Sequence, residues 1–171
     1  MWVHGSLHLS GAGVSCDRGG VIKVGEKAPG FSVKTTTGEV VTNETYRGKI
    51  LVLYFFPKAF TTGCTIESKQ FRDASPELRE AGAEVVGVSV DSLETQCEFA
   101  KSIDAGFAMI GDQDRAVSKA FDVLWPLIGK AQRVTYVIDG EGIVRGVFHH
   151  EVRVGKHLED VRSLVKSLRG K

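Results

Sequence analysis

The sequence predicts an α/β domain in which a mixed β-sheet, parallel in part, is covered by helices on both faces. Two apolar runs, Ile50–Phe56 and Glu84–Val90, are typical of strands buried on both faces, and helix-start residues follow each run. The C-terminal third adds two strand-like runs joined by a hairpin connection, and then an amphipathic helix. Because strand–helix alternation favours parallel pairing and a hairpin imposes antiparallel pairing, the two patterns together predict a mixed sheet.

Length and composition agree with this fold class. The chain has 171 residues, of which 42% are apolar and 25% are charged, and its formal net charge is +1. This length suits one domain with a real core, and the composition is that of a soluble globular protein. Lys and Arg are scattered and no apolar run is long enough to cross a bilayer, so we expect neither nucleic acid nor a membrane as a partner.

The N-terminal residues differ from the rest of the chain. We interpret residues 1–20 as a flexible leader and residues 21–171 as the folded domain. The leader has no apolar segment of the kind found in secretory signals, which favours a cytoplasmic location. It contains His4, His8 and Cys16, but a mobile segment gives metal ligands no fixed geometry. A start on a non-Met codon near residue 21, or a cloning remnant, would explain why the leader looks detachable.

The first folded elements are expected to form a hairpin. Residues 31–35 and 39–42 alternate between apolar and polar side chains, and Thr37-Gly38 between them is a turn signal. Later in the chain, Phe107–Ile110 is a short strand candidate and Asp114–Phe121 a short helix candidate.

A helix is expected after the second buried strand. Asp91 followed three residues later by Glu94 is a helix-start signature. Leu93, Cys97 and Ala100 would then share one face of the helix, so Cys97 is expected to point inward.

The C-terminal third contains the second hairpin. Val134–Ile138 and Ile143–Phe148 are expected to pair through the turn at residues 139–142. His149-His150 is interpreted as a surface pair at the strand end. The last helix is amphipathic, with apolar residues at helical spacing: Leu158, Val161, Leu164, Val165 and Leu168.

Cys64 lies where the first buried strand passes into a helix. Pro57 ends the strand, and Thr61-Thr62-Gly63 is turn and cap chemistry, so Cys64 falls in the first turn of the helix. Free backbone N–H groups and the helix dipole favour an anion there, and a thiol ionises more easily. The chain has three cysteines, Cys16, Cys64 and Cys97, too few for a disulfide framework or a Cys-rich zinc site, so a reducing compartment is the default.

The residues around Cys64 resemble a known family. Residues 57–64 match the Pro-x-x-x-Thr-x-x-Cys signature of peroxiredoxins, and Cys64-Thr-x-Glu67 with Phe71-Arg-Asp73 resembles the bacterioferritin-comigratory (PrxQ) subfamily. Residues 24–31 are similar to the opening of that subfamily, and residues 133–139 to its late strand with the active-site arginine. The resemblance extends over nearly the whole chain from Val21 and implies a thioredoxin-like fold.

The resemblance also implies a role for each site residue. Cys64 would be the peroxidatic thiolate that attacks a hydroperoxide and becomes a sulfenic acid. The Thr61 hydroxyl would bind the thiolate and the peroxide. Arg133 would supply a fixed positive charge. Pro57 would rigidify the loop and shield the sulfur, and Glu67 would orient the arginine. The family needs no metal, flavin or haem.

This sequence departs from the family pattern at the resolving cysteine. Many members carry it five residues after the peroxidatic one, where this chain has Lys69; Thr62 and Ala59 also replace a usual Pro and Asp. Other members place it in the helix after the next strand, and Cys97 lies there about one turn early. Cys97 is therefore a candidate resolver, with a packed core residue as the alternative. In the latter case an external thiol would resolve Cys64.

The function expected is a thiol peroxidase that reduces hydrogen peroxide and organic hydroperoxides and is recycled by thioredoxin or a similar dithiol. A thiol–disulfide oxidoreductase is disfavoured because Thr61 occupies the partner position of Cys-x-x-Cys. A redox sensor or chaperone-like protein, with Cys64 as a stoichiometric switch, is the alternative from another class.

We expect a monomer or weak homodimer. The segment Trp125-Pro126-Leu127-Ile128, within a loop-like but apolar stretch at residues 124–130, could fill the core, line a pocket for organic hydroperoxides or form a dimer contact.

Overall fold

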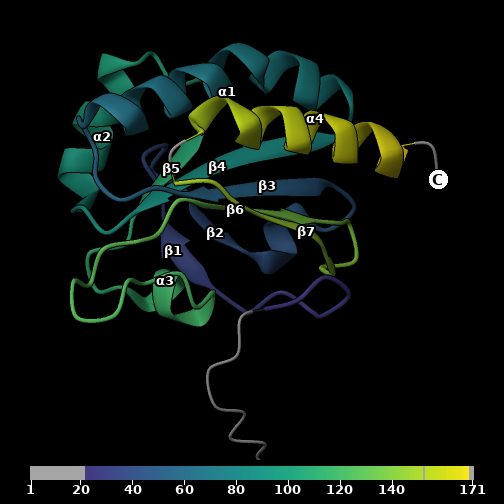
Figure 1. Cartoon of the computed structure of the whole chain (residues 1–171), viewed down its shortest axis with the longest axis horizontal. Coiled ribbons are helices and arrows are strands. Elements are labelled where there is room, and N and C mark those ends of the chain that lie inside the picture. The colour runs from purple at the N-terminus through teal and green to yellow at the C-terminus, as the bar shows by residue number, and fades with distance from the viewer. Residues whose placement is uncertain (1–21, 152, 170–171) are drawn as a thin grey trace, which may run out of the picture.

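Figure 1 shows the computed structural model, which describes residues 22–151 and 153–169. The expected leader, residues 1–20, lies outside the described residues, and the domain boundary at residue 21 stays a prediction. In chain order the elements are β1 (Ser32–Lys34), β2 (Val40–Thr42), the 3₁₀ helix η1 (Asn43–Tyr46), β3 (Ile50–Phe55), α1 (Thr62–Glu80), β4 (Ala83–Ser89), α2 (Leu93–Ser102), β5 (Ala108–Gly111), α3 (Ala116–Ala120), β6 (Val134–Ile138), β7 (Val144–His149) and α4 (Val154–Arg169).

The main sheet is mixed, as the sequence predicts. Its five strands lie in the order β5-β4-β3-β6-β7, and β1 pairs with β2 in a separate hairpin. The central strand β3 is parallel to β4 and antiparallel to β6, and β6 and β7 form the second hairpin. β3 therefore lies in the middle of the sheet, and the burial of both of its faces explains why its sequence is an almost continuous apolar run.

Two cores lie on opposite faces of the sheet. Alternate residues of β3, such as Val52 and Tyr54, face a core shared with α1, α2 and α4. Leu51, Leu53 and Phe55 face the other core, which α3 and the N-terminal segment cover. In Figure 1, α1 and α4 lie together on one side of the sheet, and α3 and the β1–β2 hairpin lie on the other. The sheet is thus covered on both faces, with the hairpin assisting α3.

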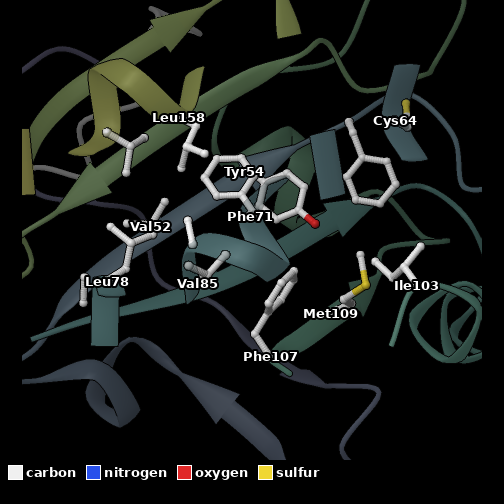
Figure 2. Packing of buried hydrophobic residues seen from close by; sticks show 14 of the residues in the cluster. Val52, Tyr54, Cys64, Phe71, Leu78, Val85, Ile103, Phe107, Met109 and Leu158 are labelled. Atoms are coloured by element: carbon white, nitrogen blue, oxygen red, sulfur yellow. The ribbon is translucent and has the colours of Figure 1, made fainter. Parts of the chain in front are cut away.

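Aromatic rings stiffen the core next to Cys64. The rings of Tyr54 and Phe71 stack with centroids 4.4 Å apart, and Figure 2 shows them side by side near the middle of the cluster. The Tyr54 hydroxyl donates to Ser68 Oγ at 3.0 Å. A Cβ added at Gly87 would lie 2.7 Å from the Tyr54 hydroxyl oxygen, so this strand position needs glycine. The face of α1 that carries Cys64 therefore rests on a close-packed layer.

The start of α2 differs from the prediction. Ser92, not Asp91, is the N-cap, and its hydroxyl accepts from the Thr95 N–H at 3.1 Å. The inward orientation expected for Cys97 is also wrong, because Cys97 is half-buried and the residues buried on α2 are Gln96 and Phe99. Neighbouring residues on a helix differ by about 100° in direction, so Cys97 lies at the edge of the buried face.

The segment at residues 125–128 is exposed rather than packed in the core. Leu124 pairs with Ala131 in an isolated antiparallel bridge, so the segment is a loop that projects from the domain. Trp125, Leu127 and Ile128 are all exposed, and Leu127 has a left-handed φ of 67°. The core-filling role is therefore wrong. Among the described residues, no helix has the length and apolar character needed to cross a membrane.

Candidate active site

Cys64 lies in the first turn of α1, as the sequence predicts. Thr61 is the N-cap with extended backbone (φ −77°, ψ 152°), α1 begins at Thr62, and Cys64 is 1% exposed. The N–H groups of the first turn have no partner within the helix, so they and the helix dipole create a positive environment around the sulfur. The backbone thus favours a negative charge at a position that bulk water scarcely reaches.

Arg133 reaches the sulfur from the neighbouring strand. It directly precedes β6, and its Nη2 lies 3.6 Å from Cys64 Sγ. Its Nη1 forms a buried ion pair with Glu67 Oε2. Cys64 and Glu67 are three residues apart on α1, so they share a face of the helix, and one guanidinium contacts both. A Cβ added at Gly63 would lie 3.3 Å from Nη2, so glycine there leaves room for the guanidinium.

The charges in this cluster are strongly coupled. Burial raises the pKa of Glu67 to about 7, although Arg133 works against that shift. Burial also works to lower the pKa of Arg133, but Glu67 and Cys64 outweigh it and raise that pKa above its ordinary value. Arg133 therefore stays a cation next to the sulfur whichever form Glu67 takes. Glu67 Oε1 and Arg133 Nε are buried without a hydrogen-bond partner among the described residues.

The two other predicted site residues lie in the loop before α1. Pro57 is half-buried, and Thr61 is exposed. The Thr61 hydroxyl donates to the Lys58 carbonyl at 2.9 Å. Its oxygen keeps acceptor capacity, and the expected bond between this hydroxyl and Cys64 or a peroxide stays a prediction.

Asp91 holds the loop before α1, a role that differs from the helix start predicted for it. Asp91 Oδ2 accepts from the Ala59 N–H at 2.8 Å and from the Ser89 hydroxyl at 2.7 Å. Asp91 was expected to start α2, and instead it ties the loop to the end of β4. The signal that could have revealed this role is its position directly after a buried parallel strand, at the sheet edge where sites of α/β proteins gather.

Cys97 lies apart from the Cys64 cluster. Both thiols are free in the structure. Cys97 lines a surface hollow between α2 and the turn after β1, together with Thr36, Lys101 and Phe107. Within residues 22–151 and 153–169, no group of three or more His, Cys, Asp or Glu side chains is arranged to hold a metal ion. The chemistry that this site offers is that of a buried sulfur beside a fixed cation.

The sequence of this chain is similar to those of known proteins. Residues 24–147 match the model of the AhpC/TSA family. The chain is 36% identical to "Peroxiredoxin Q, chloroplastic" of Sedum lineare over 146 residues, which is 85% of this chain and 78% of the relative. It is 36% identical to "Peroxiredoxin Bcp" of Bacillus subtilis over 154 residues, which is 86% of this chain and 97% of the relative.

Solved structures show the same likeness. Peroxidoxin BcpB from Mycobacterium tuberculosis superposes with a TM-score of 0.80 at 29% identity, covering 85% of this chain and 97% of that chain. Xanthomonas campestris peroxiredoxin Q superposes with a TM-score of 0.75 at 31% identity, covering 81% of this chain and 91% of that chain. The mixed sheet with its N-terminal hairpin is accordingly a thioredoxin-like fold.

Proposed function

The chain belongs to the AhpC/TSA family of peroxiredoxins, which are thioredoxin-dependent peroxidases, and from that premise we propose that Cys64 is its peroxidatic cysteine. The observation that carries the proposal is the contact of Arg133 Nη2 with Cys64 Sγ at 3.6 Å, with Glu67 holding the other arm of the guanidinium. A peroxide and a thiol reductant are the substrates that membership in this family implies.

The first half-reaction uses Cys64 as the nucleophile. Its thiolate attacks the terminal oxygen of a hydroperoxide, an S–O bond forms, and the O–O bond breaks. The departing oxide takes a proton and leaves as water or an alcohol, and Cys64 becomes a sulfenic acid. The Arg133 cation stabilises the thiolate and the charge that develops along the breaking bond. Glu67 orients Arg133, the Thr61 hydroxyl binds the incoming peroxide, and Pro57 shields the sulfur.

In the second half-reaction Cys97 is the proposed resolver. Its thiolate attacks the sulfur of the Cys64 sulfenic acid, a disulfide forms, and hydroxide leaves as water; a dithiol such as thioredoxin then reduces the disulfide. The half-buried position of Cys97 in a surface hollow supports this role better than a packed core position would. Bridged cysteines need Cα atoms within about 7 Å, and Cys64 is buried inside a helical turn, so we expect the first turn of α1 to unwind before the bond forms.

The experiment that tests the proposal is peroxide consumption coupled to thioredoxin and its reductase. We expect Cys64→Ser to lower the rate to that of the protein-free control, because the nucleophile is lost. Equal rates for the wild type and Cys64→Ser would overturn the proposal. Oxidation of Cys64 in a single turnover without recycling would instead indicate a redox sensor.

Cys97→Ser separates the two ways of resolving Cys64. With Cys97 as resolver, peptide mass mapping after one equivalent of peroxide shows a Cys64–Cys97 disulfide, and Cys97→Ser stops turnover with thioredoxin. A stable sulfenic acid on Cys64, with Cys97 still open to alkylation, would show that an external thiol resolves the enzyme.

The exposed segment at residues 125–128 keeps two of its expected roles. Trp125, Leu127 and Ile128 expose apolar surface that could line a pocket for organic hydroperoxides or contact a second copy in a weak homodimer. Sedimentation at increasing protein concentration distinguishes the two roles. If the protein is a monomer at every concentration, the dimer contact is excluded and the hydroperoxide pocket is the remaining role. The cytoplasmic location stays a prediction, because the relatives include chloroplastic proteins.

A further inference from the structure

A buried histidine lies behind the active-site arginine and has no part in the reaction described above. His157, near the start of α4, is 0% exposed. Its Nδ1 lies 2.9 Å from Thr135 Oγ1, and its Nε2 lies 3.1 Å from the His150 carbonyl oxygen. Because a carbonyl can only accept, Nε2 carries the proton, and Nδ1 then accepts from the Thr135 hydroxyl. Both ring nitrogens of the neutral imidazole are thereby used.

The first of these bonds fixes the strand that carries Arg133. Thr135 lies two residues after Arg133, and alternate residues of a strand point to the same face. Val137, the next residue in that series, packs in the core under α1 and α4. Arg133 and Thr135 are thus neighbouring side chains on one face, about 7 Å apart along the chain. Where His157 holds Thr135, it also fixes the strand next to the guanidinium.

The second bond fixes the loop that holds the Arg133 backbone. The ladder between β6 and β7 ends at the pair Val134 and His149. The Arg133 N–H lies beyond that ladder and donates to Glu151 Oε1 at 3.0 Å. Glu151 belongs to the same short connection as His150, whose carbonyl accepts from His157. His157 therefore holds both sides of the Arg133 backbone, the strand through Thr135 and the loop through His150.

We propose that His157 is a positioning residue for Arg133, whose two hydrogen bonds fix the strand and the loop that aim the guanidinium at Cys64. This inference rests on the proposed function, in which Arg133 acts on the Cys64 thiolate. His157 touches neither the sulfur nor a substrate in this scheme, and it acts only through β6 and the connection between β7 and α4.

Burial keeps His157 neutral in the working range of pH. Arg133 faces His157 from the position just before β6, His150 from the loop and Asp160 from α4, with Glu67 of α1 beyond Arg133. Burial lowers the pKa of His157 to about 4. The hydrogen bond to the His150 carbonyl and the charge of Asp160 work against that shift, and the His150 ring and Arg133 add to it. A neutral ring keeps Nδ1 as an acceptor, so the bond from Thr135 persists at neutral pH.

Two variants and a matched control test the proposal. His157→Leu removes both bonds, and Thr135→Val removes only the hydroxyl that donates to Nδ1. Val161→Ala is the control, because Val161 is also buried on α4 and its truncation weakens the same core. The readout is the rate of Cys64 alkylation by iodoacetamide as a function of pH, followed by peptide mass mapping. Single-turnover oxidation of Cys64 by hydrogen peroxide is measured alongside.

We expect His157→Leu and Thr135→Val to move the half-maximal point of alkylation to higher pH, because a misplaced Arg133 stabilises the thiolate less. Oxidation by peroxide should slow by about tenfold, less than the roughly hundredfold loss that a misplacement of about 1 Å can cause in a catalytic site. His157→Gln, which keeps a donor for the His150 carbonyl, should recover part of both effects. Val161→Ala should lower the melting temperature and leave the pH profile unchanged.

Two results would count against the proposal, and they differ from a failure of the proposed function. If His157→Leu and Thr135→Val lower only the melting temperature, as Val161→Ala does, His157 is a structural residue. Should His157→Leu fail to fold, Thr135→Val decides the question by the same profile. A wild type that consumes no peroxide would overturn the peroxidase, but the alkylation profile would still report whether His157 positions Arg133 near the thiolate.

Discussion

At the scale of single residues, the site depends on one guanidinium that serves two partners. The Arg133 fork places Nη1 on Glu67 and Nη2 on Cys64 Sγ, both in a buried setting. A lysine ammonium is a compact point charge on a flexible stem, and it cannot meet the two partners in this fixed geometry. The positive charge alone is therefore a poor substitute for the arginine.

Arg133→Lys should slow the oxidation of Cys64 by hydrogen peroxide by about a hundredfold, the scale of losing one aligned donor in a catalytic site. Stopped-flow kinetics under single-turnover conditions measure this rate. Arg162→Lys is the matched control, since Arg162 pairs with Glu77 on an exposed surface and should leave the rate unchanged. An Arg133→Lys variant as fast as the wild type would show that charge without geometry is enough.

The residues of this cluster could be predicted because a local pattern marks them. Cys64 follows a buried strand and a cap, and Glu67 and Arg133 stand in motifs of the resembling family. Asp91 could not be placed in the same way, because its bond to the Ala59 N–H joins two loops that are distant in the chain. The role of His157 is equally non-local, since its spacing on α4 predicts only a helix face.

At the scale of elements, the loop before α1 is tied to the region of α2 by two contacts. Asp91 accepts from the Ala59 N–H, and the Phe60 ring packs edge-on against Phe99 of α2 with centroids 5.2 Å apart. Phe60 has a left-handed φ of 65°, an uncommon and strained conformation for a bulky residue. The loop is therefore held in a conformation that it would leave if these contacts were lost.

Asp91→Ala should loosen this loop and the first turn of α1. Loss of a charged acceptor costs about 1.5–3 kcal/mol, which makes local opening at least about tenfold more frequent. Hydrogen exchange of amides 59–65 should accelerate accordingly, and a Cys64–Cys97 disulfide should form faster after peroxide addition. Ser92→Ala is the control, because it removes the cap of α2, worth about 1 kcal/mol, without touching the loop. Equal exchange in the two variants would rule out a holding role for Asp91.

Strands and long helices could be predicted because their patterns extend over many residues, as in β3 and α4. The orientation of Cys97 was not predictable from spacing alone, since Leu93, Cys97 and Ala100 do form one stripe. The fold buries the neighbouring stripe instead, centred on Gln96 and Phe99, because that stripe faces β5 and the Cys64 loop. The core-filling role expected for residues 125–128 was wrong for a related reason. Apolar composition alone does not distinguish a loop packed in the core from an exposed one.

At the scale of the whole molecule, two buried groups make stability depend on pH in opposite directions. Glu67 binds its proton more tightly in the folded state, with a pKa of about 7 against an ordinary 4.5. The stabilisation of the folded state by this difference in the pKa of Glu67 is present below pH 4.5 and is lost as pH rises through about 7. His157 binds its proton more weakly in the folded state, with a pKa of about 4 against 6.5. Its contribution is present above pH 6.5 and is lost as pH falls through about 4.

Because these two slopes oppose each other between pH 4.5 and 6.5, the wild type should show little net effect of either group there. Glu67→Gln removes the falling slope, so the free energy of unfolding of the wild type relative to this variant should decrease as pH rises from 4.5 to above 7. His157→Leu removes the rising slope, so the corresponding difference should increase from pH 4 to 6.5. Each change is on the order of 3 kcal/mol.

Urea unfolding at a series of pH values, followed by circular dichroism, measures these differences if unfolding is two-state. Glu80→Gln is the control, because Glu80 is an exposed carboxylate on the same helix as Glu67. Curves for Glu67→Gln or His157→Leu that run parallel to that of the wild type would mean that the group titrates alike in both states. Burial beside Arg133 would then have no effect on the pH dependence of stability. The prediction that Glu67 and His157 change the free energy of unfolding in opposite directions would be wrong.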